Sequence, residues 1–169
     1  MIRNTYKNRK MIVSQSKDNN CGPVAIINLM NWLGADYDEF PLSDILEAMK
    51  TSKMHDKCYN FTTSGMFRQD LISISRAFDI HLKRKIIESI PHLYSLIEKH
   101  SHGILCYDWV SDDLEECGSH YVTVLGATGN YIIAPNSIEG YKYKFSKKII
   151  DFYWKNTKKG SKWTFFYVD

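Results

Sequence analysis

The segment from Cys21 to Gly34 constrains the fold more than any other part of the sequence. A proline follows the cysteine two residues later, an apolar run comes next, and a glycine ends the segment. Proline fits the first turn of a helix, and glycine fits the residue just past the other end. The pattern therefore predicts a helix over about 22–33 with the Cys21 thiol at its N-terminus. Because unpaired N–H groups and the helix dipole favour an anion there, we expect a lowered thiol pKa and a nucleophilic cysteine.

Helical patterns occupy the first part of the chain and strand patterns the second. Besides 22–33 we expect helices from Ser43 to 50 and over 67–78, 89–103 and 146–154. We expect strands over 80–86, 104–109, 121–125, 131–134, 141–145 and 163–168, and a loop over 51–63. This order predicts an α+β fold in which N-terminal helices pack on one C-terminal antiparallel β-sheet. Neither a repeat nor a linker is evident, so residues 1–169 are predicted to form a single domain, with 1–14 as an extended N-terminal arm.

Length, charge and cysteine content argue against several classes of protein. The 169 residues suit one hydrophobic core, and a net charge of +3 is too small to indicate nucleic-acid binding by itself. The sequence shows no signal peptide and no apolar run long enough to cross a membrane, so a soluble, cytoplasmic protein with reduced thiols is expected. The four cysteines (21, 58, 106 and 117) lack the paired spacing of zinc ligands, and we expect neither a metal nor another cofactor.

A nucleophilic cysteine needs a base within reach and a group that orients the base. His120 opens the apolar strand 120–125, and Asn136 follows the next strand, 131–134. The intervening residues 126–130 predict a turn, so we expect the two strands to pair as a hairpin. The start of the first strand then lies beside the end of the second. His120 and Asn136 would meet at one edge of the sheet, where an amide oxygen can hold the histidine tautomer.

These residues resemble the active-site residues of papain-like cysteine proteases. Gln15 stands six positions before Cys21 and Gly22, as the oxyanion-hole glutamine and the nucleophile do in that superfamily. His120, followed sixteen residues later by Asn136, resembles the histidine and the asparagine of the same superfamily. The likeness extends through the predicted hairpin that joins them.

Within that superfamily, the chain looks most like the peptidase C39-like group, which includes proteases that cut leader peptides after a double glycine. The resemblance covers roughly residues 12–168, with specific motifs only at 15–23 and 120–137. The end of the chain also fits, because a helix that starts at a serine is followed by a final hydrophobic strand. The fold that this resemblance implies is the papain-like cysteine protease fold.

The activity that the resemblance implies is that of a cysteine peptidase. Cys21 would be the nucleophile and His120 the base, while Asn136 would orient the base and Gln15 would stabilise the oxyanion. The implied reaction is hydrolysis of a peptide or isopeptide bond through a thioester. The same chemistry also supports hydrolysis of a side-chain amide or transfer to an amine.

Two positions depart from the C39-like pattern. Proteins of that group usually carry an aspartate before the cysteine and Asp-Pro after the second strand, where this chain has Asn20 and Ala134-Pro135. The orienting position is either Asn136, whose spacing from His120 fits the papain pattern, or the position held by Ala134. The second case leaves open an alternative function, a weakly active or inactive peptidase-fold protein that binds a peptide or protein partner.

Two charged segments bear on the choice of partner. Residues 108–116 place five acidic side chains just before His120. They are most simply a solvated loop, and as a rim of the active site they would favour a basic peptide or protein substrate. Residues 142–162 carry eight lysines that we expect to be solvated. We therefore expect neither a membrane nor a nucleic acid as a partner, and the sequence leaves the oligomeric state open.

Overall fold

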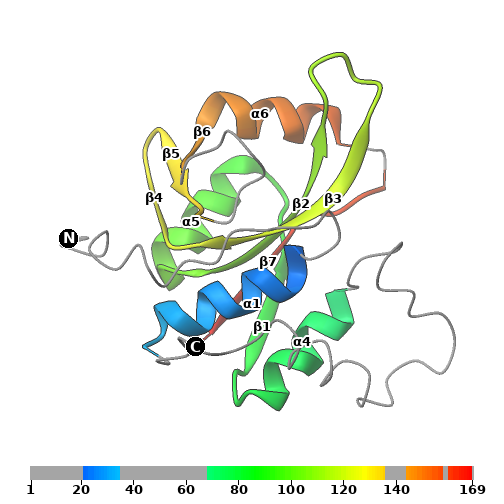
Figure 1. Cartoon of the computed structure of the whole chain (residues 1–169). Coiled ribbons are helices and arrows are strands. Elements are labelled where there is room, and N and C mark those ends of the chain that lie inside the picture. Colours follow the sequence, from blue (N-terminus) through cyan, green and yellow to red (C-terminus); the bar gives the residue numbers. More distant parts are fainter. Residues whose placement is uncertain (1–20, 35–67, 136–143, 158–159, 169) are drawn as a thin grey trace, which may run out of the picture.

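The computed structural model describes residues 21–34, 68–135, 144–157 and 160–168 (Figure 1). Its helices are α1 (Cys21–Trp32), α4 (Arg68–Ala77), α5 (Ile90–His100) and α6 (Lys147–Asn156). Its strands are β1 (Leu82–Ile86), β2 (Gly103–Val110), β3 (Cys117–Val124), β4 (Gly126–Thr128), β5 (Tyr131–Ile133), β6 (Lys144–Ser146) and β7 (Thr164–Val168). All of the paired strands are antiparallel, which confirms the predicted α+β fold.

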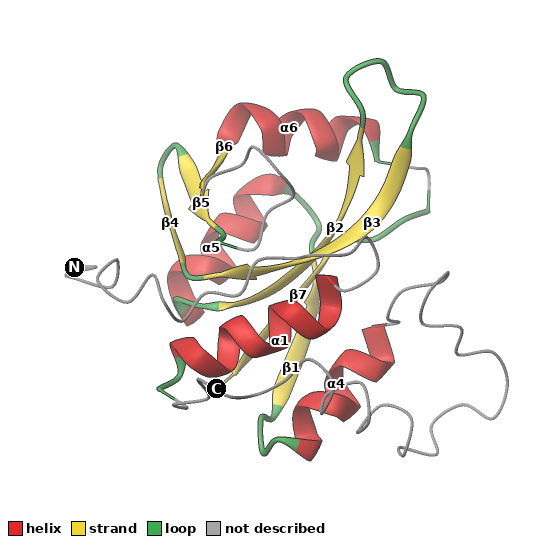
Figure 2. Ribbon diagram, viewed as in Figure 1, coloured by secondary structure: helices red, strands yellow, loops and turns green. Residues whose placement is uncertain are grey.

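The described strands form two sheets instead of the single sheet that the sequence predicts. The larger sheet has the order β1-β7-β2-β3, so β1 and β3 are its outer strands. The smaller sheet has the order β4-β5-β6. Figure 2 shows α1 and α4 on one side of the larger sheet, and α5 and α6 on the other side.

Each face of the larger sheet builds its own hydrophobic core. Side chains of α1 and α4 pack against Ile104, Cys106 and Phe166 on one face. Side chains of α5 and α6 pack against Leu105 and Phe165 on the opposite face. All residues of α1 from Cys21 to Met30 are buried. A helix that is buried on all sides belongs to the interior of a protein, and α1 is the central helix of the first core.

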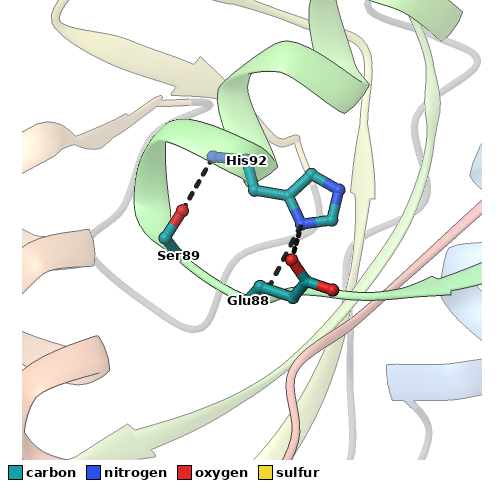
Figure 3. A network of polar contacts seen from close by, with 3 residues as sticks. All are labelled: Glu88, Ser89 and His92. Carbon is teal, nitrogen blue, oxygen red and sulfur yellow. Dashed lines mark hydrogen bonds and ion pairs between the residues drawn. The ribbon is translucent and has the colours of Figure 1, made fainter.

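Helix starts follow the capping residues that the sequence predicts. The Ser89 hydroxyl accepts a hydrogen bond from the His92 N–H at 3.2 Å, which caps α5 (Figure 3). The His92 ring reaches back, and its Nδ1 accepts a hydrogen bond from the Glu88 N–H at 3.3 Å. The Ser146 hydroxyl likewise accepts from the Ile149 N–H at 3.3 Å and caps α6. Each cap satisfies a main-chain donor that a helix start would otherwise leave without an acceptor.

The predicted hairpin is wrong in its first strand and in the position of its turn. Residues 117–124 pair with β2, and the short strand β4 pairs with β5 instead. The turn consists of Gly129 and Asn130 and is shorter than the predicted turn, because the residues before it belong to β4. The chain leaves the larger sheet after Val124 and enters the smaller one at Gly126, whose φ of 144° is a conformation that glycine adopts readily.

The remaining predicted elements agree with the structure wherever the described residues include them. The strand expected over 141–145 is found as β6, which begins at Lys144 within the described residues. The predicted helix from Ser43, the loop 51–63 and the arm 1–14 lie outside the described residues. The single domain remains a prediction. None of the described helices has the length and the apolar character needed to cross a membrane.

Substituting Gly103 should destabilise the larger sheet. A Cβ at this position would overlap the Phe166 carbonyl oxygen and lie 2.7 Å from the Phe165 ring. Overpacking in a core typically costs about 1–3 kcal/mol, so Gly103→Ala should lower the free energy of unfolding by about 2 kcal/mol or more in a denaturant titration. Gly129→Ala is the matched control, because a Cβ there meets nothing within 4 Å. Equal stability of the two variants would contradict the packing of β2 against β7.

Candidate active site

Cys21 is the first residue of α1, which confirms the predicted helix start at the thiol. The side chain is 6% exposed. The helix is held against the outer strand β3 by a buried hydrogen bond of 2.9 Å, which the Thr123 hydroxyl donates to the Ala25 carbonyl oxygen. This bond lies one helical turn beyond the thiol, so it fixes the distance of Cys21 from the strand.

Main-chain groups at the outer edge of β3 face the start of α1. The Ser111 N–H donates to the Glu116 carbonyl oxygen at 2.9 Å, which marks this pair as hydrogen-bonded. Hydrogen-bonded and non-hydrogen-bonded pairs alternate along antiparallel strands, so the register directs the Tyr121 N–H away from β2. That N–H donates a hydrogen bond to the Cys21 sulfur. The thiol therefore sits at the edge of the larger sheet, beyond which no further strand lies among the described residues.

Burial raises the pKa of the Cys21 thiol above its ordinary value of 9.0. The backbone N–H groups of Tyr121, Gly22 and Cys21 itself act in the opposite direction, but their effect is smaller. The prediction of a lowered pKa is therefore wrong. That prediction considered the effect of the helix N-terminus but not desolvation. Desolvation disfavours the charged form of a thiol on a helix that is buried on all sides.

His120 lies in β3, immediately before Tyr121, and is 3% exposed. Successive side chains of a strand point to opposite faces, so His120 faces the α5 and α6 side while Tyr121 faces α1. Its ring meets the Tyr107 ring edge-on, with centroids 5.6 Å apart and an interplanar angle of 88°. Tyr107 is also its register partner on β2. Cys21 and His120 thus lie on opposite sides of the same outer strand.

The other two predicted site residues, Gln15 and Asn136, lie outside the described residues. Their roles remain predictions. Ala134, the alternative orienting position, follows β5 and is fully buried in the core on the α5 and α6 side, which also contains Tyr107. Because a methyl group accepts no hydrogen bond, the Ala134 side chain cannot orient an imidazole.

A polar cluster beside Cys21 was missed by sequence reasoning. The Arg68 guanidinium, at the start of α4, hydrogen-bonds to the buried Cys106 thiol, which in turn hydrogen-bonds to the Tyr121 side chain. Arg68 Nη2 also donates to the Lys162 carbonyl oxygen at 2.6 Å. Burial raises the pKa of Cys106, and the Arg68 charge acts against that rise. These residues are far apart in sequence, and no local motif joins them.

Asp108 belongs to the same face of the sheet and is 8% exposed. One carboxylate oxygen accepts a hydrogen bond from the Ser119 hydroxyl at 2.8 Å, and the other is buried without a hydrogen-bond partner. Asp108 was predicted as part of an acidic loop. The structure confirms an exposed connection only for residues 111–116, because Asp108 itself lies within β2.

The described part of the chain brings no three His, Cys, Asp or Glu side chains together in a group that could hold a metal ion.

Stability should fall at alkaline pH because of the buried cluster. Burial raises the pKa of Cys21, Cys106 and Tyr121 in the folded protein, so the unfolded chain loses these protons first. Linkage then lowers the free energy of unfolding as the pH rises above about 9. Chemical denaturation across this range should show a smaller decline in Cys106→Ala than in the unsubstituted protein. In Cys117→Ala, at an exposed thiol, the decline should persist. An identical decline in all three proteins would contradict the contribution of Cys106.

Comparisons with known proteins give a match at the level of structure. No family model matches the sequence, and no curated protein matches it. A matching solved structure is that of a protein from Bacillus anthracis described as a "putative C39-like peptidase". The match has a TM-score of 0.56 and 12% sequence identity, and it covers 95% of this chain and 96% of that chain. At this identity the match shows the fold alone, and the chain shares its α+β fold with that structure.

Proposed function

We propose that the protein is a cysteine peptidase that hydrolyses a peptide or isopeptide bond. The observation that carries the proposal is the position of Cys21, at the start of a buried helix whose first turn meets the open edge of β3. Backbone N–H groups surround the sulfur there, as they would surround an anion. The shared fold with a C39-like structure supports the same function.

Catalysis begins with proton transfer from Cys21 to His120. Because burial raises the pKa of the thiol, the resting form is neutral and its proton leaves only when a base accepts it. The two side chains lie on opposite sides of β3, so the transfer requires them to meet at the outer edge of that strand. The resulting thiolate attacks the substrate carbonyl carbon and forms a tetrahedral oxyanion.

The oxyanion is stabilised by the Cys21 backbone N–H and the Gln15 side-chain amide. When it collapses, the bond to the amine breaks, and His120 gives its proton to the leaving nitrogen. Water then hydrolyses the thioester, with His120 as the base, and the Cys21 thiol is regenerated. Asn136 is assigned the orienting role, because the Ala134 side chain offers no acceptor. The exposed acidic loop 111–116 would favour a basic peptide.

A second candidate function is peptide or protein binding without hydrolysis. Two observations favour it, the raised pKa of Cys21 and the methyl side chain of Ala134 at the alternative orienting position. A protein of this kind would keep the fold and its edge-exposed backbone while its thiol stayed inert.

A peptidyl chloromethyl ketone should distinguish the two functions at neutral pH. Such a reagent is attacked by an activated cysteine, so we expect Cys21 to react faster than Cys106, which is also buried. Removing a general base typically costs 10²–10⁴ in rate, so His120→Ala should slow the modification by about a hundredfold or more. His81→Ala, at an exposed histidine, is the control. Mass spectrometry of tryptic peptides locates the label, and equally slow labelling of Cys21 in all three proteins would favour the binding function.

Replacing Gln15 tests the oxyanion site separately. Loss of one oxyanion donor typically lowers turnover on the order of 10²–10³, so Gln15→Ala should impair hydrolysis of a peptide substrate by that factor. Its thermal unfolding temperature should stay close to that of the unsubstituted protein. Unchanged turnover in a folded Gln15→Ala variant would remove Gln15 from the mechanism.

A further inference from the structure

The strand β1 has a row of main-chain groups on its outer edge with which no described strand pairs. It lies at the end of the larger sheet opposite β3 and pairs with β7 on its other side (Figure 1). The Ile87 N–H donates to the Trp163 carbonyl oxygen at 2.9 Å, which marks this pair as hydrogen-bonded. Because hydrogen-bonded pairs alternate along the register, the main-chain groups of Lys83 and Lys85 bond to β7. The N–H and C=O groups of Arg84 and Ile86 then point outward, away from β7.

Three of the five side chains of this strand are basic, and they are exposed on both faces. Only Leu82 is buried, in the core with α1 and α4, and the four residues after it are exposed. Arg84 and Ile86 share the face of Leu82, whereas Lys83 and Lys85 point to the face of α5. Ile86 is 49% exposed, which places an apolar side chain beside the Arg84 charge.

The nearest carboxylates along the chain already have partners of their own. Asp79 lies 3.4 Å from the His81 ring, and Glu88 lies 4.0 Å from the His92 ring. Within the described residues, neither Arg84 nor Lys85 has a carboxylate oxygen within 4.0 Å. Among the described residues, no carboxylate therefore neutralises the Arg84 and Lys85 charges, and no strand pairs with the main-chain donors and acceptors beside them.

Basic residues on an outer strand often serve only to prevent edge-to-edge aggregation. They do so by repelling a second copy, since antiparallel self-pairing would set like charges opposite one another. The same row attracts a strand of opposite charge, whose main chain can bond to the open groups while its acidic side chains meet the basic ones. Main-chain pairing then provides affinity, and charge provides the choice of partner.

We propose that the outer edge of β1 is a docking site for an extended acidic segment of a partner protein, which adds to the larger sheet as a further strand. The outward N–H and C=O groups of Arg84 and Ile86 form the hydrogen bonds. The Arg84 and Lys85 side chains meet carboxylates on the two faces of the added strand. This site is distant from Cys21 along the sheet and does not depend on the proposed peptidase function.

Fluorescence anisotropy with a labelled peptide of alternating threonine and glutamate tests the proposal on the full chain. We expect the glutamate peptide to bind, with an affinity that falls as salt is added, and the corresponding threonine–lysine peptide not to bind. Lys85→Glu should weaken binding by about tenfold, because it places like charges together. Lys148→Glu makes the same substitution at an exposed lysine of α6 and should leave the affinity unchanged. Equal effects of the two substitutions would overturn the proposal.

A matched pair of variants separates strand addition from simple charge attraction. Arg84→Ala removes only the side-chain charge, whereas Arg84→Pro also removes the outward N–H. We expect the proline variant to bind several-fold more weakly than the alanine variant. Identical affinities would overturn strand addition, and tight competition by a single-stranded oligonucleotide would identify a general polyanion surface instead.

Hydrogen exchange on the unsubstituted protein also tests the main-chain pairing, and it needs no variant that could misfold. Peptide binding should slow exchange at the Arg84 and Ile86 main-chain N–H groups. Lys83 and Lys85 should change less, because their N–H groups already donate to β7. Binding that leaves exchange at Arg84 and Ile86 unchanged would overturn the proposed main-chain pairing.

Discussion

Two hydrogen bonds from β3 fix the buried helix α1, and the candidate site depends on both. The Tyr121 N–H donates to the Cys21 sulfur, and the Thr123 hydroxyl donates to the Ala25 carbonyl oxygen. The donors are two residues apart on a strand, about 6.6 Å, and the acceptors are four residues apart on a helix, about 6 Å. Because these spacings match, the helix follows the strand in the same direction. A shift of either element would break both bonds together.

The elements that the sequence predicts well are those whose boundaries are set by local chemistry. Ser89 and Ser146 cap their helices through their own hydroxyl groups, so a short window of sequence contains the cause. The division into two sheets has no such local cause. Residues 120–125 have the apolar pattern of a strand whichever partner they pair with, and in the structure those up to Val124 pair with β2. A glycine before a turn is compatible with either outcome, so tertiary pairing decides.

The residues of the candidate site likewise divide into those that the sequence predicts and those that it does not. Cys21 and His120 could be selected from sequence because each stands at a recognisable boundary, the start of a helix and the start of an apolar run. Arg68 and Cys106 could not, since their contact joins α4 to the middle of β2. The direction of the Cys21 pKa shift was also beyond sequence reasoning. The helix N-terminus is visible in the sequence, but the desolvation that outweighs it depends on how completely the fold covers α1.

Neighbouring residues of β3 have different roles, because their main-chain and side-chain directions alternate along the strand. The His120 main chain belongs to a hydrogen-bonded pair with Tyr107, so it is fixed within the sheet. The Tyr121 main chain points outward, so it is available to the Cys21 sulfur. A slip of one residue would exchange these roles and move every side chain of the strand to the other face. The burial of Val122 and Val124 in one core and of Tyr121 in the other prevents such a slip. Packing along β3 therefore sets where the thiol and the imidazole lie relative to each other.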